Sequence, residues 1–190
     1  MAWPIYVALG DSLGAGRDAD AWPARLARTL AERTGRSCVL TDLSADRAEV
    51  ADVIDGQFPA VPALRPDLIS VTVGMTDIRD PEFEECRFGS DVKWLFDGLA
   101  AMTATLLTCT LPDIADRLPI PAVLVPMVHD RMRVAGEAIR AEAAAHGALC
   151  VDAWRLPGLA GRANFSDDRV HLSPHGHQTL ADTFADLLTG

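Results

Sequence analysis

The sequence lacks the features of a membrane-spanning, exported or nucleic-acid-binding protein. No apolar run among its 190 residues approaches the roughly 20 residues that cross a bilayer. The N-terminus has no basic stretch before its first strand-like segment, so we expect no signal peptide. Basic residues are also scarce, because 17 Lys and Arg stand against 27 Asp and Glu for a formal net charge of −10. Such a field repels phosphate backbones and anionic lipid, so we expect neither nucleic acid nor a membrane surface as a partner.

Cysteine is too sparse for a disulfide framework or a metal centre. The four cysteines are dispersed along the chain, and there is no CxxC motif or Cys/His cluster with tetrahedral spacing. The sequence therefore predicts no bound metal and no other cofactor. We interpret the thiols as reduced and structural, which together with the expected lack of an export signal favours the cytoplasm. They are Cys38, Cys86, Cys109 and Cys150.

Repeats, low-complexity tracts and Gly/Ser linkers are absent as well, so residues 1–190 are expected to form one domain. A hydrophobic fraction of 49% with 23% charged residues is typical of a globular protein rather than a disordered one. A domain of this size buries about 70% of its unfolded surface, so it needs no disulfide or metal to stabilise it.

The chain alternates short β-rich runs with helical stretches. Strands without polar alternation, each followed by a helix, are typical of a parallel sheet covered on both faces. The pattern therefore predicts a three-layer α/β/α sandwich with a five-stranded parallel sheet. The expected strands are residues 5–9, 38–43, 68–73, 105–110 and 148–152. The expected helices are residues 21–33, 49–58, 90–102 with Ser90 as a candidate N-cap, 127–146, and a last helix from Ser173-Pro174 with Leu180, Phe184, Leu187 and Leu188 facing inward.

Two groups at opposite ends of the chain together indicate nucleophilic catalysis. Ser12 lies in a glycine-rich turn directly after the first expected strand, and Asp168 precedes His171 by three residues. That spacing lets the Asp carboxylate accept the Nδ1–H of the imidazole on one turn, which leaves Nε2 to face Ser12. A serine hydroxyl needs such an oriented base before it becomes a nucleophile. Each motif alone is more often simple turn chemistry, and their combination is what makes the prediction specific.

The segment Gly10-Asp11-Ser12-Leu13-Gly14 also matches the GxSxG motif, which forms the nucleophile elbow of α/β-hydrolases. That elbow normally follows several strands, whereas only one precedes it here, so we reject that fold. The stretch matches neither GxGxxG nor GxxxxGK[ST], so phosphate binding is the weaker interpretation.

Four blocks in order resemble the SGNH (GDSL) hydrolase family, particularly its small bacterial esterase- or thioesterase-like members. They are Gly10-Asp11-Ser12-Leu13, the stretch Arg65-Pro66-Asp67 to Val73-Gly74-Met75-Thr76-Asp77, Thr110-Leu111-Pro112-Asp113, and Asp168-Arg169-Val170-His171-Leu172-Ser173. The resemblance covers nearly the whole chain. It implies a flavodoxin-like fold and serine-based cleavage of esters or thioesters, with Ser12 as nucleophile, His171 as base and then acid, and Asp168 as orienting carboxylate.

Two positions depart from the family pattern, and both belong to the oxyanion hole that the resemblance implies, next to the Ser12 N–H. Arg47 occupies the position of a family glycine, and Thr76 replaces the asparagine that the family carries in the block ending at Asp77. A backbone N–H survives the first change if the conformation does. The threonine hydroxyl is shorter than a carboxamide, and losing such a donor costs about 10²–10³ in rate. The Arg47 guanidinium could compensate as a charged donor or meet an anionic substrate.

These departures leave alternatives open. The leading hypothesis is a cofactor-free serine hydrolase that cleaves a small carboxylic ester or thioester through an acyl-enzyme. An acyltransferase with the same triad, and a catalytically weakened binding protein of this fold, are the alternatives. For the other candidate groups we favour structural roles: packing or capping for His175 and His177, and core positions for Trp22, Trp154 and Phe165.

Overall fold

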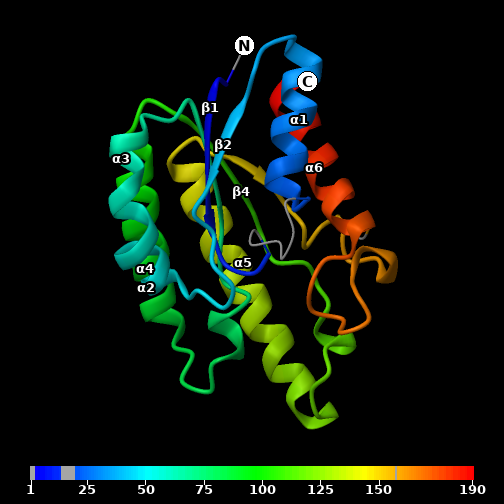
Figure 1. The fold of residues 1–190 in the computed structure, drawn as a ribbon. Coiled ribbons are helices and arrows are strands. Elements are labelled where there is room, and N and C mark those ends of the chain that lie inside the picture. The colour runs from blue at the N-terminus through cyan, green and yellow to red at the C-terminus, as the bar shows by residue number, and fades with distance from the viewer. Residues whose placement is uncertain (1–2, 14–19, 157) are drawn as a thin grey trace.

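One parallel sheet forms the centre of the molecule. The computed structural model describes residues 3–13, 20–156 and 158–190 (Figure 1). The strands are β1 (Ile5–Gly10), β2 (Val39–Asp42), β3 (Leu68–Thr72), β4 (Thr105–Cys109) and β5 (Leu149–Val151). Their order is β2-β1-β3-β4-β5, and every neighbouring pair is parallel. The predicted five-stranded parallel sheet of flavodoxin-like order is thereby confirmed.

Helices cover both faces of the sheet, as Figure 1 shows. Helices α1 (Trp22–Thr34) and α6 (Pro174–Thr189) lie together on one face. Helices α4 (Glu85–Ala100) and α5 (Val125–Ala145) pack on the other. Alternation along β1 divides the core accordingly, since Tyr6 and Ala8 join the α1/α6 cluster while Val7 and Leu9 join the opposite one.

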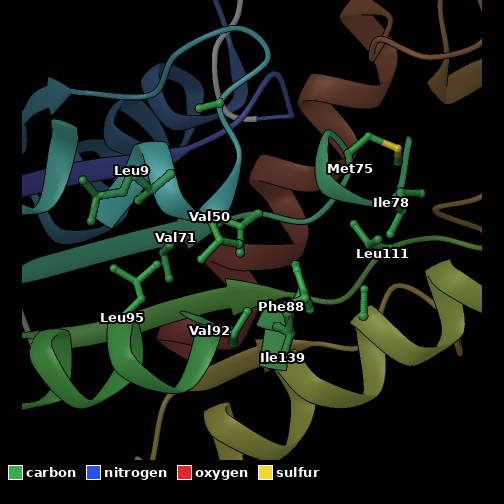
Figure 2. Close-up of a cluster of buried hydrophobic side chains, with 14 of the residues drawn as sticks. Leu9, Val50, Val71, Met75, Ile78, Phe88, Val92, Leu95, Leu111 and Ile139 are labelled. Carbon is green, nitrogen blue, oxygen red and sulfur yellow. The ribbon is translucent and has the colours of Figure 1, made fainter. Parts of the chain in front are cut away.

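The larger core cluster extends beyond the strands to the loops that follow them (Figure 2). Ile78 is fully buried, and Met75 and Leu111 are nearly so. Met75 and Ile78 belong to the loop after β3, and Leu111 to the loop after β4. Apolar anchoring of this kind fixes the position of Thr76, which lies between the first two.

The helix expected over residues 49–58 is broken into short pieces, so that prediction is only partly right. The pieces are α2 (Val50–Asp52), a π-helical turn η1 (Val53–Gln57), a 3₁₀ turn η2 (Phe58–Ala60) and α3 (Val61–Leu64). Pro59 and Pro62 lack the backbone N–H that a continuous helix requires. The π-helical turn ends on Gln57, whose side chain is buried beside β1.

Two details of the expected helices are wrong. Helix α4 begins at Glu85, and Ser90 lies inside it with its hydroxyl donating to the Cys86 carbonyl. The helix extends backward because Phe88 is buried on the same face as the residues that follow it. In α6, Ser173 is the N-cap as expected, but Leu187 is 39% exposed because Phe184 and its i, i+4 neighbours form the buried stripe.

All four cysteines are free thiols. Three are buried or half-buried among apolar groups, whereas Cys86 is exposed, so its thiol does not pack in the core. In the described part of the chain, none of the helices combines the length and apolarity that crossing a membrane would require.

Candidate active site

The loops at the carboxyl ends of β1, β2 and β3 bring three predicted site residues to one edge of the sheet. Ser12 follows β1, Arg47 follows β2 and Thr76 follows β3. Parallel strands end on the same side, so residues separated by more than 60 positions share one rim. The segment between β5 and α6 adds Asp168 and His171 to this rim.

The turn that carries Ser12 depends on a glycine before it. Gly10 has a φ of 135°, and a Cβ there would collide with the Thr72 carbonyl oxygen of β3. The buried Gln57 amide pairs with both backbone groups of Gly10, accepting from its N–H at 2.8 Å and donating to its carbonyl at 3.0 Å. A close backbone approach and a buried amide therefore fix where β1 ends.

Asp11 joins the Ser12 turn to the Thr76 loop. Its carboxylate is fully buried and accepts the N–H of Leu13 at 2.9 Å and the N–H of Met75 at 3.0 Å. On the far side of the turn, the indole N–H of Trp22 donates to the Leu13 carbonyl at 2.8 Å. Burial raises the pKa of Asp11 to about 7, against the lowering effect of those two amide donors. The turn is thus held from both sides by side chains of its neighbours.

Asp168 and His171 occupy a tight hairpin just before α6. An antiparallel bridge between Phe165 and Leu172 closes the hairpin, and the Ser166 N–H donates to the His171 carbonyl at 2.8 Å. Asp168 Oδ2 is 2.6 Å from His171 Nδ1, which is the contact that the three-residue spacing predicts. The hairpin therefore places the carboxylate and the imidazole side by side without help from another element.

The Asp168 carboxylate fixes which nitrogen of His171 carries a proton. Partial burial works to raise the pKa of Asp168, but the N–H groups of Val170 and His171 and the imidazole outweigh it and lower that pKa to about 2. An ionised carboxylate can only accept hydrogen bonds, so Nδ1 of His171 donates to it. The lone pair of Nε2 is then free to accept a proton.

These residues line one open cleft of about 750 Å³, here called the Ser12 cleft. Its lining consists of Ser12, Asp46, Arg47, Glu49, Thr76, Arg79, Asp80, Pro119, Asp168, Val170 and His171. Among the residues that the structure describes, no hydrogen bond joins Ser12 Oγ to His171 Nε2, and Asp46 Oδ1 lies 3.9 Å from that nitrogen. Such contacts are often long in an empty site and tighten when substrate binds.

Arg47 and Thr76 stand on opposite sides of the Ser12 turn. Arg47 is exposed and has a φ of 62°, a conformation that glycine adopts freely and other residues rarely. Thr76 is half-buried and precedes the 3₁₀ turn η3 (Asp77–Arg79) as its N-cap residue. The backbone at position 47 therefore keeps the geometry of a glycine although its side chain is arginine.

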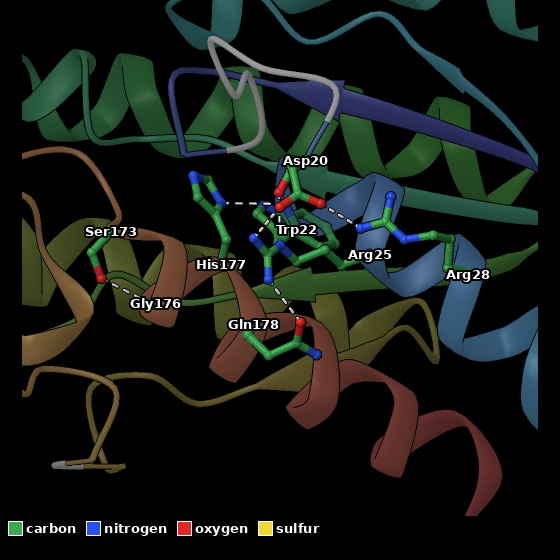
Figure 3. Close-up of polar contacts among 8 residues, drawn as sticks. All are labelled: Asp20, Trp22, Arg25, Arg28, Ser173, Gly176, His177 and Gln178. Atoms are coloured by element: carbon green, nitrogen blue, oxygen red, sulfur yellow. Dashed lines mark hydrogen bonds and ion pairs between the residues drawn. The ribbon is translucent and has the colours of Figure 1, made fainter.

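Of the groups for which we expected packing or capping, His177 and the three aromatics have such roles, whereas His175 is exposed, so its side chain does not pack in the core. His177 Nδ1 accepts the N–H of Trp22 at 3.2 Å, so it caps the start of α1 from α6 (Figure 3). Burial lowers the pKa of His177, which keeps the ring neutral for this role. Phe165 and Trp22 are buried and Trp154 is half-buried. In the part of the chain that the structure describes, no group of three or more His, Cys, Asp or Glu side chains is arranged to hold a metal ion.

Sequence reasoning missed four charged residues of the cleft, which are Asp46, Glu49, Arg79 and Asp80. Asp46 faces the imidazole of His171, and Arg79 lines both this cleft and a second, apolar pocket beside it. Both lie in the loops that follow β2 and β3, where ligands collect in parallel sheets, so their position along the chain was the available signal.

The chain matches the model of one known protein family over most of its length. The model of the GDSL-like lipase/acylhydrolase family matches residues 8–179. No curated protein matches the sequence closely enough to count as a relative.

Solved structures share the fold over nearly the whole chain. LAE5, an alpha/beta hydrolase enzyme from the metagenome of Lake Arreo in Spain, is 24% identical with a TM-score of 0.79, and the match covers 98% of this chain and 95% of that one. An acetylxylan esterase from Geobacillus stearothermophilus is 18% identical with a TM-score of 0.79, covering 100% and 95%. TesA is 19% identical with a TM-score of 0.78, covering 97% and 98%. At these identities the likeness shows a common fold.

Proposed function

The chain belongs to the GDSL-like lipase/acylhydrolase family and is therefore a hydrolase, and we propose that it cleaves small carboxylic esters or thioesters through an acyl-enzyme on Ser12. In this proposal His171 is the general base and then the general acid, and Asp168 orients it. The Ser12 and Arg47 N–H groups and the Thr76 hydroxyl stabilise the oxyanion.

One observation carries the proposal. A serine at the end of β1 and an imidazole already paired with a carboxylate line the same cleft, although 159 positions of sequence separate them. The His171–Asp168 pair is formed within its own hairpin, which supports the role of a preset base.

The first half of the reaction makes the acyl-enzyme. Ser12 Oγ attacks the carbonyl carbon of the substrate while His171 Nε2 takes the hydroxyl proton. Asp168 stabilises the resulting imidazolium through Nδ1–H. Collapse of the tetrahedral intermediate breaks the bond to the leaving oxygen or sulfur, which receives the proton from Nε2. The acyl group then remains on Ser12 as an ester.

The second half returns the free enzyme. A water molecule in the open cleft gives a proton to His171 Nε2 and attacks the acyl-enzyme carbonyl. The second tetrahedral intermediate expels Ser12 Oγ, which recovers its proton from the imidazole. An alcohol in place of water would complete an acyl transfer by the same steps, so the acceptor alone separates the two outcomes.

Labelling with a fluorophosphonate, read by intact mass, tests the nucleophile and its base. We expect one adduct on the wild-type chain, none on Ser12→Ala, and labelling slowed by at least about 10²-fold in His171→Ala, since general-base assistance is worth that much or more. Ser90→Ala, an exposed serine on α4, is the matched control and should label like wild type. An adduct that persists in Ser12→Ala, or a rate indifferent to His171→Ala, would overturn the proposal.

The fate of the acyl group is measured in the same preparation. With an activated ester as donor, we expect the carboxylic acid as the main product in the presence of added methanol or glycerol. A product dominated by the new ester would replace hydrolysis with acyl transfer while leaving the role of Ser12 intact.

A further inference from the structure

A second pocket adjoins the Ser12 cleft and differs from it in chemistry. This apolar pocket has a volume of about 370 Å³ and shares Arg79, Pro119 and Val170 with the cleft. Carboxylates and arginines dominate the cleft lining, whereas aliphatic side chains dominate this one. Its apolar walls are Ile78, Leu118, Ile120, Leu124, Met127 and Val128.

Arg131 of α5 lines the apolar pocket, but its guanidinium is already hydrogen-bonded to backbone carbonyls. Its guanidinium donates to the carbonyls of Ile78 at 3.2 Å, Asp80 at 2.6 Å and Pro81 at 3.2 Å. It also lies over the Phe83 ring, 5.3 Å from the ring centroid. The aliphatic stem is left to face the pocket, as is usual for arginine at an apolar surface. Arg131 thereby holds the loop over residues 78–81 against α5 and keeps the pocket open between them.

The rim of the apolar pocket is itself apolar and exposed. Among the lining residues, Met127 is 42% exposed and Leu124 38%. These side chains continue the aliphatic surface of the pocket outward along the start of α5. Contiguous exposed apolar surface beside a pocket marks a place where an apolar ligand lies.

We propose that this pocket binds the acyl chain of the substrate, an unbranched aliphatic chain of about four to eight carbons. The proposal rests on the proposed function, in which the acyl carbonyl lies at Ser12. The group that stays on the enzyme as the acyl-enzyme belongs in the apolar pocket. The leaving group and the incoming water pass through the polar, open cleft. One water occupies ~30 Å³ in the liquid, and a methylene is of similar size. A pocket of about 370 Å³ is roughly twelve times that volume, so a chain of up to eight carbons fits in it.

The chain-length profile of hydrolysis tests the proposal directly. Along the 4-nitrophenyl esters of acetate, butanoate, hexanoate and octanoate, we expect kcat/KM to rise about threefold to fourfold for each methylene buried, up to hexanoate at least. Along acetates of ethanol, butanol and hexanol, in which the alcohol lengthens instead, we expect no such rise. A profile that is flat or falls from acetate, or one that follows the alcohol, would overturn the assignment.

A matched pair of leucines tests the position of the chain. Leu124 at the pocket rim is 38% exposed, and Leu187 on α6, outside the pocket lining, is 39% exposed. We expect Leu124→Asn to lower the ratio of hexanoate to acetate kcat/KM by about tenfold, and Leu187→Asn to leave that ratio as in wild type. Equal effects of the two variants would contradict the proposal, because only one lies beside the chain.

Arg131 is a positioning residue in this proposal, and its substitution is read by selectivity. Arg131→Met keeps an apolar stem but releases the three carbonyls, so we expect the hexanoate-to-acetate ratio to fall, chiefly through KM. Arg131→Lys, which retains a donor, should restore part of the ratio. An equal proportional fall in kcat/KM for the hexanoate and the acetate ester would mean that Arg131 contributes only to general stability.

Binding without catalysis separates failure of this proposal from failure of the proposed function. In Ser12→Ala, calorimetric affinity for acetate, butanoate, hexanoate and octanoate ions should rise along the series. A rising series in a protein that cleaves no ester would keep the apolar pocket and remove the hydrolytic role of Ser12. Ester cleavage by the wild type with a flat series would do the reverse.

Discussion

At Arg47 the backbone and the side chain have separable roles. The φ of 62° places it in a region that costs a non-glycine residue about 1–2 kcal/mol. Arg169, in the hairpin between Asp168 and His171, has a φ of 63° and carries the same cost. Strain of this kind concentrates at functional sites. In the proposed oxyanion hole, the strained backbone of Arg47 provides an N–H donor, while its guanidinium adds a positive charge to the Ser12 cleft.

Two substitutions at Arg47 separate these roles. Arg47→Gly should raise the free energy of unfolding by about 1 kcal/mol, because glycine adopts this backbone freely, whereas Arg47→Ala should give no such gain. Both should lower kcat/KM for 4-acetoxybenzoate, whose leaving group carries a carboxylate, by about tenfold, and should lower kcat/KM for the neutral methyl 4-acetoxybenzoate much less. Urea unfolding and steady-state kinetics check the two parts. Equal losses on both esters would contradict recognition of charge by Arg47.

Thr76 is the residue whose side chain limits the proposed oxyanion hole. In the part of the chain that the structure describes, no hydrogen bond fixes its hydroxyl, and that hydroxyl reaches less far than a carboxamide. We expect Thr76→Asn to raise kcat on simple aryl esters by about tenfold or more, a part of the 10²–10³ that such a donor is worth. Steady-state kinetics on 4-nitrophenyl acetate measure the change. Unchanged or lower activity would mean that threonine is already suited to its acyl group.

At the scale of elements, the sequence predicts what local contacts decide. The Asp168 and His171 contact and the Ser173 N-cap form within a few residues, so their spacing is sufficient to predict them. The region of residues 49–58 is different, because its π-helical turn is stabilised by burial of Gln57 against Gly10, 47 positions away. Helix and strand patterns carry no information about such a long-range pair.

The apolar pocket illustrates the same limit. It is formed where the loop after β3 meets the segment after β4 and the start of α5, and its Arg131 contacts span about 50 positions. The sequence predicts that the loops after the strands carry the site, but side-chain packing between them decides which residues meet. Leu187 shows this within one helix, since an apolar residue near the stripe still lies 39% exposed.

The junction of α6 with the hairpin depends on one glycine of the helix. A Cβ at Gly176 would collide with the backbone carbonyl of Asn164, just before the hairpin that carries His171. We expect Gly176→Ala to displace that hairpin and to lower kcat/KM by about 10²-fold, since misplacement by about 1 Å has that effect. Gly89→Ala is the matched control, because this helical glycine of α4 has open space around it.

Unfolding and kinetics distinguish the two glycines. Gly89→Ala should raise stability by about 0.5–1 kcal/mol through helix propensity and leave kcat/KM unchanged. The Gly176→Ala variant should lose both activity and stability. If Gly176→Ala keeps wild-type activity, the hairpin is not positioned by its contact with α6.

At the scale of the whole molecule, the net charge is −10, and some of the acidic residues that produce it are buried. Asp11 and Asp77 are carboxyl groups inside the fold, and burial raises their pKa values to about 7 and about 6. Well below pH 4 both are protonated in the folded and unfolded states alike. As the pH rises, the unfolded chain releases these protons first, so stability falls. Asp168 acts oppositely, since a pKa of about 2 adds stability above pH 4 that is lost on acidification.

Asp77 offers the cleaner test of this balance. Its Oδ1 accepts the Val50 N–H at 3.1 Å, while the buried Oδ2 has no hydrogen-bond partner among the described residues. In Asp77→Asn the amide oxygen can keep the bond to Val50, and the charge is gone. With a folded pKa of about 6 against an ordinary value of 3.8, the wild type loses stability between about pH 4 and pH 6. The variant should therefore match it near pH 4 and exceed it by on the order of 1–3 kcal/mol at pH 7.

Urea unfolding of wild type and Asp77→Asn from pH 4 to pH 8 measures that difference, with Asp55→Asn, an exposed carboxylate on η1, as the control. Only the difference between the curves matters, because titrating groups far from Asp77 contribute equally to both. The charge of Asp77 also helps to raise the pKa of Asp11, so its removal stabilises the variant further in the same direction as the pH rises. A gap that grows from pH 4 to pH 6 and then stays constant is the pattern of one buried carboxyl that ionises in the folded state. A constant gap across the range would assign the effect to packing, and a gap that closes as the pH rises would reverse the sign and contradict the burial of an unpaired charge.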